Sequence, residues 1–193
     1  MKLSSEFYKR PAVEVARDLL GKVLVCGEAK GIIVETEAYI GPEDKASHTA
    51  GGRHTERNDA MYRAGGCVYV YTIYGMHICF NVVTGPVGRG EAVLVRALEP
   101  IEGIELMKKR RGVEDVRNLT SGPGKLCAAM GIDKSFYGES LTGERIRIED
   151  RGLRPEIVVS RRINVDYAEE WAEKLLRFTV KDSPFVSVKR FMV

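Results

Sequence analysis

The sequence predicts a single α+β domain over residues 1–193, with a curved, mostly antiparallel, barrel-like β-sheet and peripheral helices. Segments rich in β-branched and aromatic residues are separated by polar turns, as in antiparallel hairpins. Apolar residues at helical spacing occur only in short segments, which predicts a few helices around the sheet. No repeat, low-complexity tract or linker divides the chain, so one domain is expected.

The first elements are a helix and a hairpin. Residues 11–20 have apolar side chains at helical spacing, Pro11 suits the first turn of a helix and Gly21 suits its end. A strand at residues 22–26, a polar turn and a second strand at residues 31–40 then predict a hairpin.

The strongest strand signal lies at residues 67–83, which are rich in aromatic and β-branched side chains. Tyr74 and Gly75 stand where one strand turns into the next, so a β-hairpin with an aromatic residue at its tip is expected. By alternation, Tyr69 and Tyr71 share one face of the sheet and Tyr74 lies off it. Sheet packing is the usual role of such tyrosines, but it explains Tyr74 poorly because loop tips face solvent.

The second half of the chain predicts further strands and helices. A strand is expected at residues 91–98, and Pro100 is expected to open a helix that ends with the basic residues 108–111, whose charges suit the helix dipole. Small residues at 120–125 precede a short helix at residues 126–130, and backbone amides at such a helix start suit an anion. The tail predicts strands at residues 145–149, 156–165 and 175–180.

Residues 34–48 are where chemistry is expected. Glu35, Glu37 and Tyr39 alternate along a strand and therefore project from one face. Carboxylates two apart beside an apolar run repel each other and lose hydration unless cations, hydrogen bonds or water satisfy them. A structural strand has little use for this pattern, although an edge strand whose Glu35 and Glu37 face water is an alternative. His48 follows in a loop.

Arginines mark several candidate contacts. Arg96 interrupts an apolar run, and an arginine there is rarely buried without an anionic partner, for which Glu35 or Glu37 is expected. The loop at residues 51–58 carries two arginines, which either meet phosphates or are solvated. Residues 151–165 contain four arginines and one acid, a basic stretch that could face DNA.

Composition leaves the partner open. With 44% hydrophobic and 30% charged residues, the chain is typical of a globular protein, and a net charge of +3 allows a polyanionic partner without requiring one. The four cysteines have no Cys-x-x-Cys pair, so reduced, mostly buried thiols in a cytosolic protein are expected. Neither a signal peptide nor a membrane span is expected from the sequence.

Four blocks of sequence, in order, resemble the alkyladenine DNA glycosylase (3-methyladenine DNA glycosylase) family, and the similarity runs from about residue 16 to residue 188. The blocks are Val-Glu-Thr-Glu-Ala-Tyr at 34–39 with Gly-Pro-Glu-Asp at 41–44 and His48, Tyr-Val-Tyr-Thr-Ile-Tyr-Gly-Met at 69–76, Arg-Ala-Leu-Glu-Pro at 96–100, and Ser-Gly-Pro-Gly-Lys-Leu at 121–126.

The resemblance implies a monofunctional enzyme of base excision repair that flips damaged purines out of duplex DNA and hydrolyses their N-glycosidic bond. Tyr74 and Met76 then match the hairpin residues that intercalate into the DNA. Tyr39, His48 and Tyr71 match the rings that stack on the flipped base, where electron-rich rings favour a cationic, alkylated purine.

The same resemblance implies catalytic roles. Glu37 matches the general base that activates the water, and Arg96 matches the residue that positions Glu37 and the water, with a backbone carbonyl near Ile163 completing the site. Asn81 matches the side chain that obstructs the amino group of normal guanine. No lysine is placed as a Schiff-base nucleophile, and neither a metal nor a cofactor is implied.

The implied partner is double-stranded DNA that contains damaged purines, without a membrane, and the implied state is a monomer. The implied location is the cytoplasm, beside the nucleoid, of a prokaryote, or the nucleus of a eukaryote. The sequence does not select among 3-methyladenine, 7-methylguanine, hypoxanthine and ethenoadenine, because a shift of less than about an ångström in a pocket decides such preferences.

Two other functions are compatible with parts of the pattern. A metal-dependent hydrolase would use Glu35, Glu37, His48 and His54, but their spacing matches no common metal motif. A non-catalytic nucleic-acid-binding module would have no use for Glu37.

Overall fold

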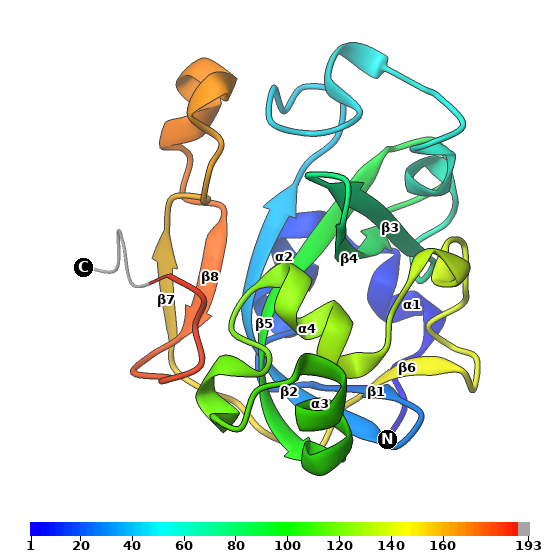
Figure 1. Ribbon diagram of the computed structural model, residues 1–193. Coiled ribbons are helices and arrows are strands. Elements are labelled where there is room, and N and C mark those ends of the chain that lie inside the picture. The colour runs from blue at the N-terminus through cyan, green and yellow to red at the C-terminus, as the bar shows by residue number, and fades with distance from the viewer. Residues whose placement is uncertain (189–193) are drawn as a thin grey trace.

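The computed structural model describes residues 1–188 of the chain. At its centre is an eight-stranded sheet in the order β3-β4-β5-β2-β1-β6, to which β8 is joined through β2 and β7 through β8 (Figure 1). The strand pairings are antiparallel throughout, so the predicted α+β class and mostly antiparallel sheet are confirmed. In residues 1–188 the end strands β3 and β6 do not pair with each other, so the sheet is open and "barrel-like" is too strong a description.

The elements have the following bounds. The strands are β1 (Val23–Cys26), β2 (Ala29–Tyr39), β3 (Val68–Ile73), β4 (His77–Thr84), β5 (Glu91–Glu102), β6 (Ile146–Glu149), β7 (Ile157–Ser160) and β8 (Arg177–Val180). The α-helices are α1 (Ser5–Tyr8), α2 (Ala12–Asp18), α3 (Ile104–Arg111) and α4 (Pro123–Met130). Short 3₁₀ helices are η1 (Ala50–Gly52), η2 (Asp59–Tyr62), η3 (Val116–Asn118), η4 (Lys134–Phe136) and η5 (Asp166–Glu173).

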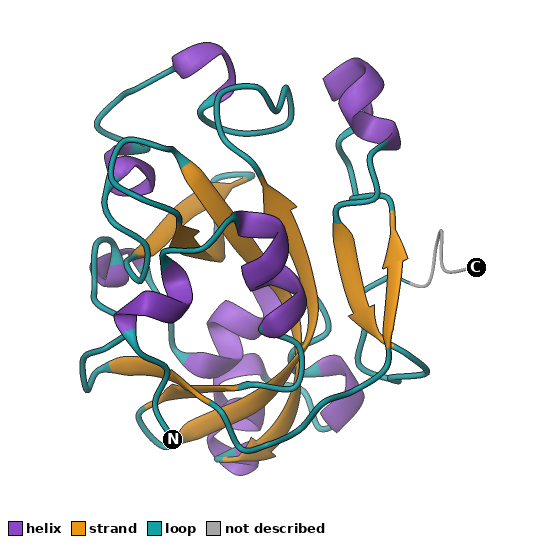
Figure 2. Cartoon of the chain, turned by 180° about the vertical axis from the view of Figure 1, so that it is seen from behind, coloured by secondary structure: helices purple, strands orange, loops and turns teal. Residues whose placement is uncertain are grey.

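Helices lie on both sides of the sheet. In Figure 1, α3 and α4 lie in front of the central strands and α2 lies behind them, and Figure 2 shows the same arrangement from behind. Helix α2 packs on β2 and β5, and α4 packs on β4 and β5. The predicted peripheral helices are therefore confirmed.

Two expectations from composition can be compared with the structure. All four cysteines are free thiols, and three of them are buried, as expected for a chain with reduced cysteines. None of the helices in residues 1–188 combines the length and the apolar composition that crossing a bilayer requires.

Strand β2 is an interior strand. It pairs with β5 along one side and with β1 and β8 along the other. Glu35 and Glu37 on this strand are 0% exposed. The alternative of an edge strand with both carboxylates in water is therefore wrong, because neighbouring strands cover both edges of β2.

The register of the sheet places residues from distant parts of the chain in one row. Glu37 pairs with Leu94 of β5, Leu94 with Asn81 of β4, and Asn81 with Tyr69 of β3. On the other side of β2, Glu37 pairs with Arg177 of β8. Paired residues on neighbouring strands project from the same face at a spacing of about 4.8 Å, so this row lines one face of the sheet.

The predicted hairpin with an aromatic tip is confirmed. The amide of Met76 donates to the carbonyl of Ile73 at 3.2 Å, and the two residues between them, Tyr74 and Gly75, both have positive φ (50° and 75°). Positive φ at both central residues is the condition for the tight type I′ turn that joins twisted antiparallel strands. Gly75 meets this condition without steric cost, and the turn leaves Tyr74 at the tip.

The expectation that a helix starts at Pro100 is wrong. Pro100 belongs to β5, where it pairs with Gly31 at a shift in register. Proline has no N–H to donate and is tolerated in a sheet at such irregularities. Gly103, with a φ of 73°, ends the strand, and α3 begins only at Ile104.

Two further boundaries differ from expectation. Residues 123–125, expected to precede a helix at 126–130, form its first turn, because Pro123 occupies the first helical position of α4. The strand expected at residues 156–165 is shorter, since β7 ends at Ser160. The Arg162 side chain turns into the interior to bond Asp44, and Asn164 adopts a left-handed φ of 58°, so the chain leaves the sheet here.

Candidate active site

Glu37 lies at the centre of the candidate site, on β2, and its carboxylate is fully buried. Oε1 accepts a hydrogen bond from the amide of Ile163 at 2.7 Å. Oε2 accepts from the hydroxyl of Tyr39 at 2.9 Å and from Nη1 of Arg96 at 3.4 Å. These donors compensate the loss of hydration that burial imposes on the carboxylate. Ile163 contributes its amide here, and the role expected for a nearby carbonyl stays a prediction.

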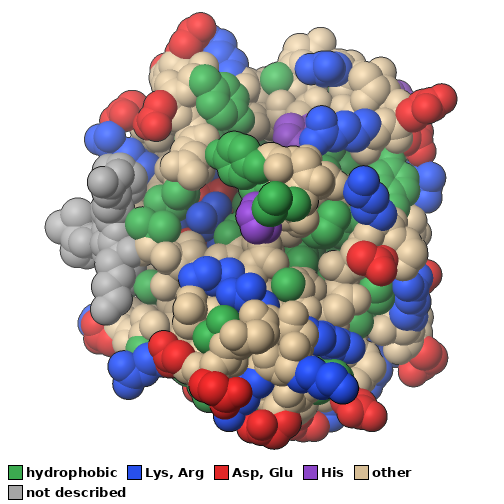
Figure 3. Space-filling view, viewed as in Figure 1, with side chains coloured by type: hydrophobic (Ala, Val, Ile, Leu, Met, Phe, Trp, Pro, Cys, Tyr) green, Lys and Arg blue, Asp and Glu red, His purple; other side chains and the backbone are tan. Residues whose placement is uncertain are grey.

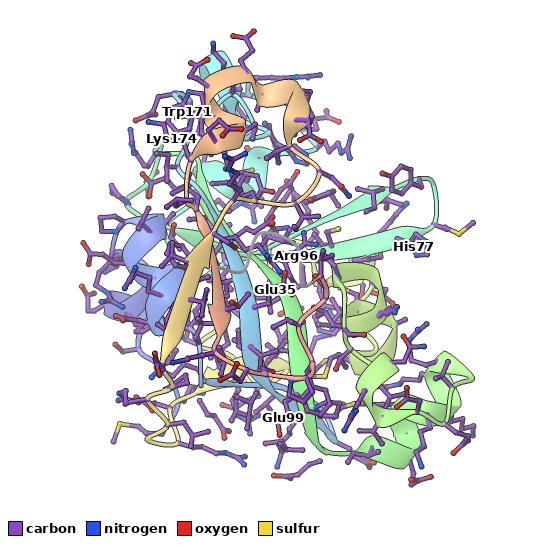
Figure 4. All side chains as sticks on the ribbon, turned by 90° about the vertical axis from the view of Figure 1, so that its left-hand side faces the viewer. Glu35, His77, Arg96, Glu99, Trp171 and Lys174 are labelled. Carbon is purple, nitrogen blue, oxygen red and sulfur yellow. The ribbon has the colours of Figure 1, made fainter. Side chains whose placement is uncertain are left out.

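Glu35 is held even more tightly. Its Oε1 accepts from Nε of Arg96 at 2.9 Å, from Nε of Arg177 at 2.8 Å and from Oγ of Ser187 at 2.9 Å. Its Oε2 accepts from the amide of Ser187 at 2.6 Å. Burial raises the pKa of Glu35, but the charges of Arg96 and Arg177, together with the hydrogen bonds from Ser187 and Arg177, outweigh burial and hold that pKa below its ordinary value. Figure 4 shows Glu35 and Arg96 pointing toward each other at the centre of the molecule.

Arg96 therefore pairs with both carboxylates that the sequence offered as alternatives. Burial lowers the pKa of the Arg96 guanidinium, but the negative charges of Glu37 and Glu35 raise it by more. The pKa of Arg96 therefore lies above its ordinary value. The sequence analysis missed Arg177, which is 0% exposed and also donates to Oγ of Ser160 at 3.2 Å. The sequence contains a signal for this residue, because Arg177 interrupts a strand-like segment just as Arg96 does.

The four residues expected in a base pocket line one cavity. The cavity between their side chains has a volume of about 50 Å³ and opens to solvent. Aromatic and small apolar side chains form most of the wall. The lining residues are Tyr39, Ala46, His48, Met61, Tyr69, Tyr71, Asn81, Ala92 and Tyr167.

His48 sits among aromatic rings. Its Nδ1 lies 2.7 Å from the hydroxyl of Tyr69, and its ring centroid lies 4.5 Å from that of Tyr71 at an interplanar angle of 68°. Burial, with the nearby charges of Arg57 and Arg53, lowers the pKa of His48 to about 4. The imidazole is therefore neutral at physiological pH, so it does not repel a cation in the cavity.

The cavity adjoins Glu37. Tyr39 lines the cavity, and its hydroxyl donates to Glu37. Asn81 reaches the cavity from the row that also carries Glu37, and its Nδ2 donates to the carbonyl of Tyr69 at 3.2 Å. A planar ligand between these aromatic rings would lie beside a buried carboxylate and its arginine.

A second buried ion pair holds the outer part of the site together. Arg162 donates to both carboxylate oxygens of Asp44, at 2.6 and 2.9 Å, and both side chains are 0% exposed. Arg162 also donates to the carbonyl of Ala38 at 3.0 Å, and its guanidinium carbon lies 4.7 Å from the centroid of the Tyr39 ring. The residue after it, Ile163, bonds Glu37. This pair fixes the loop before His48 against the Ile163 segment.

The basic stretch at residues 151–165 is not the open basic surface that its charge suggested. Its arginines all bond carboxylates of the protein: Arg151 bonds Glu102 and Glu149, Arg154 bonds Asp150, Arg161 bonds Glu173, and Arg162 bonds Asp44. The prediction that this stretch faces DNA is therefore wrong for Arg162, which is buried, and it stays a prediction for Arg151, Arg154 and Arg161, which are exposed.

The hairpin tip and the loop at residues 51–58 remain exposed beside the cavity. Tyr74 is 84% exposed and Met76 is 74% exposed. Figure 4 shows this hairpin, with His77 near its end, projecting from the body of the molecule. Arg57 donates to the carbonyl of Thr72 at 3.1 Å, which ties the loop to the hairpin.

The donor arrangement does not favour a metal-dependent hydrolase. Glu35 and Glu37 flank a guanidinium, whose positive charge opposes a cation at this position. His54 bonds Asp59 at 3.0 Å instead of joining His48. Over residues 1–188, the His, Cys, Asp and Glu side chains form no group of three or more that could hold a metal ion.

Comparisons with known proteins are consistent with one another. A family model described as methylpurine-DNA glycosylase matches residues 6–184. Relatives whose names contain the words 3-methyladenine DNA glycosylase include one from Natranaerobius thermophilus, 47% identical over 97% of this chain and 100% of its own length, and one from Clostridium novyi, 50% identical over 97% and 99%. The DNA-3-methyladenine glycosylase of Homo sapiens is 46% identical over 97% of this chain and 68% of its own length.

Replacing Glu35 is expected to destabilise the protein. The Glu35→Gln variant leaves Arg96 and Arg177 without their shared buried charge, so its free energy of unfolding should fall by about 3–5 kcal/mol in urea denaturation at pH 7. The difference should shrink as the pH falls below about 4.3, because the depressed pKa of Glu35 stabilises the fold only while the unfolded chain is also ionised. Glu114→Gln, at an exposed ion pair with Lys108, is the control and should change stability by less than about 1 kcal/mol. Equal effects of the two substitutions would contradict the role given to Glu35.

The protonation of His48 can be followed directly. Its ring proton resonance in an NMR titration should shift with a midpoint near 4. The His48→Asn variant identifies the resonance. A midpoint at or above the ordinary histidine value of about 6.5 would show that the surroundings of this ring do not disfavour its charged form.

Proposed function

This chain belongs to the methylpurine-DNA glycosylase family and is a DNA N-glycosylase of the 3-methyladenine type that acts in DNA repair, and on this premise we propose that Glu37 activates the hydrolytic water for a purine flipped out of duplex DNA. The observation that carries the proposal is the Glu37 carboxylate, buried between Arg96 and Ile163 beside an aromatic cavity. We further propose that the chain acts as one domain and as a monomer.

The proposed hydrolysis uses a water molecule and the carboxylate of Glu37. Water attacks C1′ of the deoxyribose and passes a proton to Glu37, and the bonding electron pair of the N-glycosidic bond leaves with the purine. An alkylated, positively charged purine departs as a neutral base, whereas a neutral purine such as hypoxanthine departs as an anion that takes up a proton from solvent. Glu37 can receive the water because, within residues 1–188, its Oε1 accepts only the Ile163 amide and retains a lone pair. The negative charge of Glu37 also stabilises the oxocarbenium character of the sugar.

The exposed hairpin supplies a wedge for base flipping. A base inside the duplex cannot reach a buried carboxylate, and extruding it costs a few kcal/mol. Tyr74 and Met76 are large apolar side chains that the protein leaves in solvent at the end of a tight turn. Inserted between base pairs, they would fill the gap that the flipped nucleotide leaves and so offset part of the cost.

The cavity accounts for selectivity. Tyr39, Tyr71 and neutral His48 offer electron-rich rings, each of which favours a cationic purine by about 0.5–2 kcal/mol where the geometry is good. Asn81 lies at the wall of the cavity, where its amide would meet the exocyclic amino group of normal guanine. Steric and polar mismatch of this kind excludes undamaged bases without weakening the attraction for damaged ones.

The surface around the site suits a polyanion. On the face shown in Figure 3, Lys and Arg side chains lie both around the central hydrophobic side chains and along the right edge, whereas Asp and Glu side chains lie mainly near the rim. Arg53 and Arg57 lie in the exposed loop beside His48, where phosphates of a bound duplex would pass. Damaged double-stranded DNA is therefore the partner that we propose.

The Glu37→Gln variant tests the catalytic role. Base release from a duplex with a single hypoxanthine, assayed with a chelator, should fall by at least about 100-fold, because the amide cannot accept the proton of the water. Binding to a duplex with an abasic-site analogue should be retained, which controls for folding. Wild-type rates in this variant would contradict the proposal, because a group other than Glu37 would then activate the water.

The Tyr74→Ala variant tests the wedge. Excision from duplex DNA should fall at least about 10-fold, the effect of losing about 1.4 kcal/mol of support for the flipped state. Val87→Ala is the matched control, because Val87 is an apolar residue that is 74% exposed, comparable to the 84% of Tyr74, but lies outside the hairpin. An unchanged excision rate in Tyr74→Ala would remove this residue from the mechanism.

A further inference from the structure

Tyr167 is a large aromatic side chain that the fold does not bury. It lies in η5, on the connection between β7 and β8, and is 69% exposed. Its neighbours Val165 and Ala168 are buried in a small apolar cluster with Ala46. Core packing therefore explains the apolar residues on either side of Tyr167 but not an aromatic ring at this position.

The Tyr167 side chain lines the purine cavity. It joins Tyr39, His48 and Tyr71 in the cavity wall, although it comes from a part of the chain far from theirs. Its hydroxyl donates to the carbonyl of Ala46, another lining residue, at 3.3 Å. The exposed area of Tyr167 is thus an aromatic surface at the side of a cavity already walled by aromatic rings.

Ion pairs hold this wall in place. Lys45, next to Ala46, bonds Glu169 at 2.6 Å and Glu170 at 2.9 Å, both in η5. At the base of the same connection, Arg162 donates to the carbonyl of Trp171 at 3.3 Å while it bonds Asp44. Figure 4 shows Trp171 and Lys174 at the end of the molecule where η5 stands beyond the sheet. These contacts tie η5 to the loop that carries His48.

We propose that Tyr167 is a further base-contacting residue, an aromatic wall at the mouth of the pocket that the flipped purine covers. The inference rests on the proposed function and adds a specificity residue to it. A purine against Tyr167 would remove exposed ring surface from water on both partners, and aromatic pairs are more favourable than their buried area alone predicts.

Single-turnover excision of hypoxanthine and of 7-methylguanine from duplex DNA tests the proposal. Tyr167→Ala should lower kcat/KM by about 2- to 12-fold, the effect of losing one aromatic contact. Tyr167→Phe keeps the ring and loses only the hydrogen bond to Ala46, so its kcat/KM should lie close to that of the wild type. Leu175→Ala is the control, because Leu175 is 58% exposed on the same connection and does not line the cavity.

A second measurement separates a base contact from a contact with the DNA backbone. Affinity for a duplex with an abasic-site analogue should be unchanged in Tyr167→Ala, because no base enters the pocket. The proposal is overturned if the wild type is active and Tyr167→Ala excises both bases at the wild-type rate, or if that variant loses as much affinity for the abasic duplex as it loses in excision. If the wild type releases neither of these bases, nor any base from alkylated genomic DNA, the proposed function itself fails, and this inference fails with it.

Discussion

The buried guanidinium of Arg96 is the charge on which the rest of the site depends. It bonds Glu35 through Nε and Glu37 through Nη1, and so joins two carboxylates that stand two residues apart on one strand face. Without a cation between them, these carboxylates would repel each other at a position shielded from bulk solvent. With it, both can stay buried beside an aromatic cavity. Removing any one member of such a network leaves a buried charge without compensation, so the members depend on one another.

This network also connects distant parts of the chain. Arg177 of β8 and Ser187, near the end of the described residues, both bond Glu35 in the central strand β2. A buried ion network is seldom the most stable way to fill a core, because apolar residues of the same volume avoid the cost of desolvation. The proposed chemistry explains why the network is kept in spite of this cost. The contacts that join β8 to β2 at Glu35 also position Arg96, and Arg96 positions Glu37. The contacts that hold β8 on the central strand β2 are therefore also the contacts that position the site residues.

Local patterns in the sequence were enough to predict much of this. Alternation placed Glu35, Glu37 and Tyr39 on one face, and the turn at Tyr74 and Gly75 predicted the hairpin tip. Long-range pairing was not predictable from such patterns. Glu35 and Arg177 are 142 positions apart and meet only because β8 pairs with β2. The sequence favours a DNA-facing Arg162, because it shows the charge of this residue but neither its burial nor its partner Asp44. No local pattern in the sequence predicts that Tyr167 lies in the cavity wall.

The central claim is that Arg96 joins the two buried carboxylates and holds Glu37 in place for catalysis, and single-turnover base release by Arg96 variants tests it most directly. In the Arg96→Met variant two buried carboxylates remain without their shared cation, so the rate should fall about as far as in Glu37→Gln. Arg96→Lys keeps the positive charge and should lose less activity. A wild-type rate in Arg96→Met would contradict the claim, because Glu37 would then act without the guanidinium that holds it.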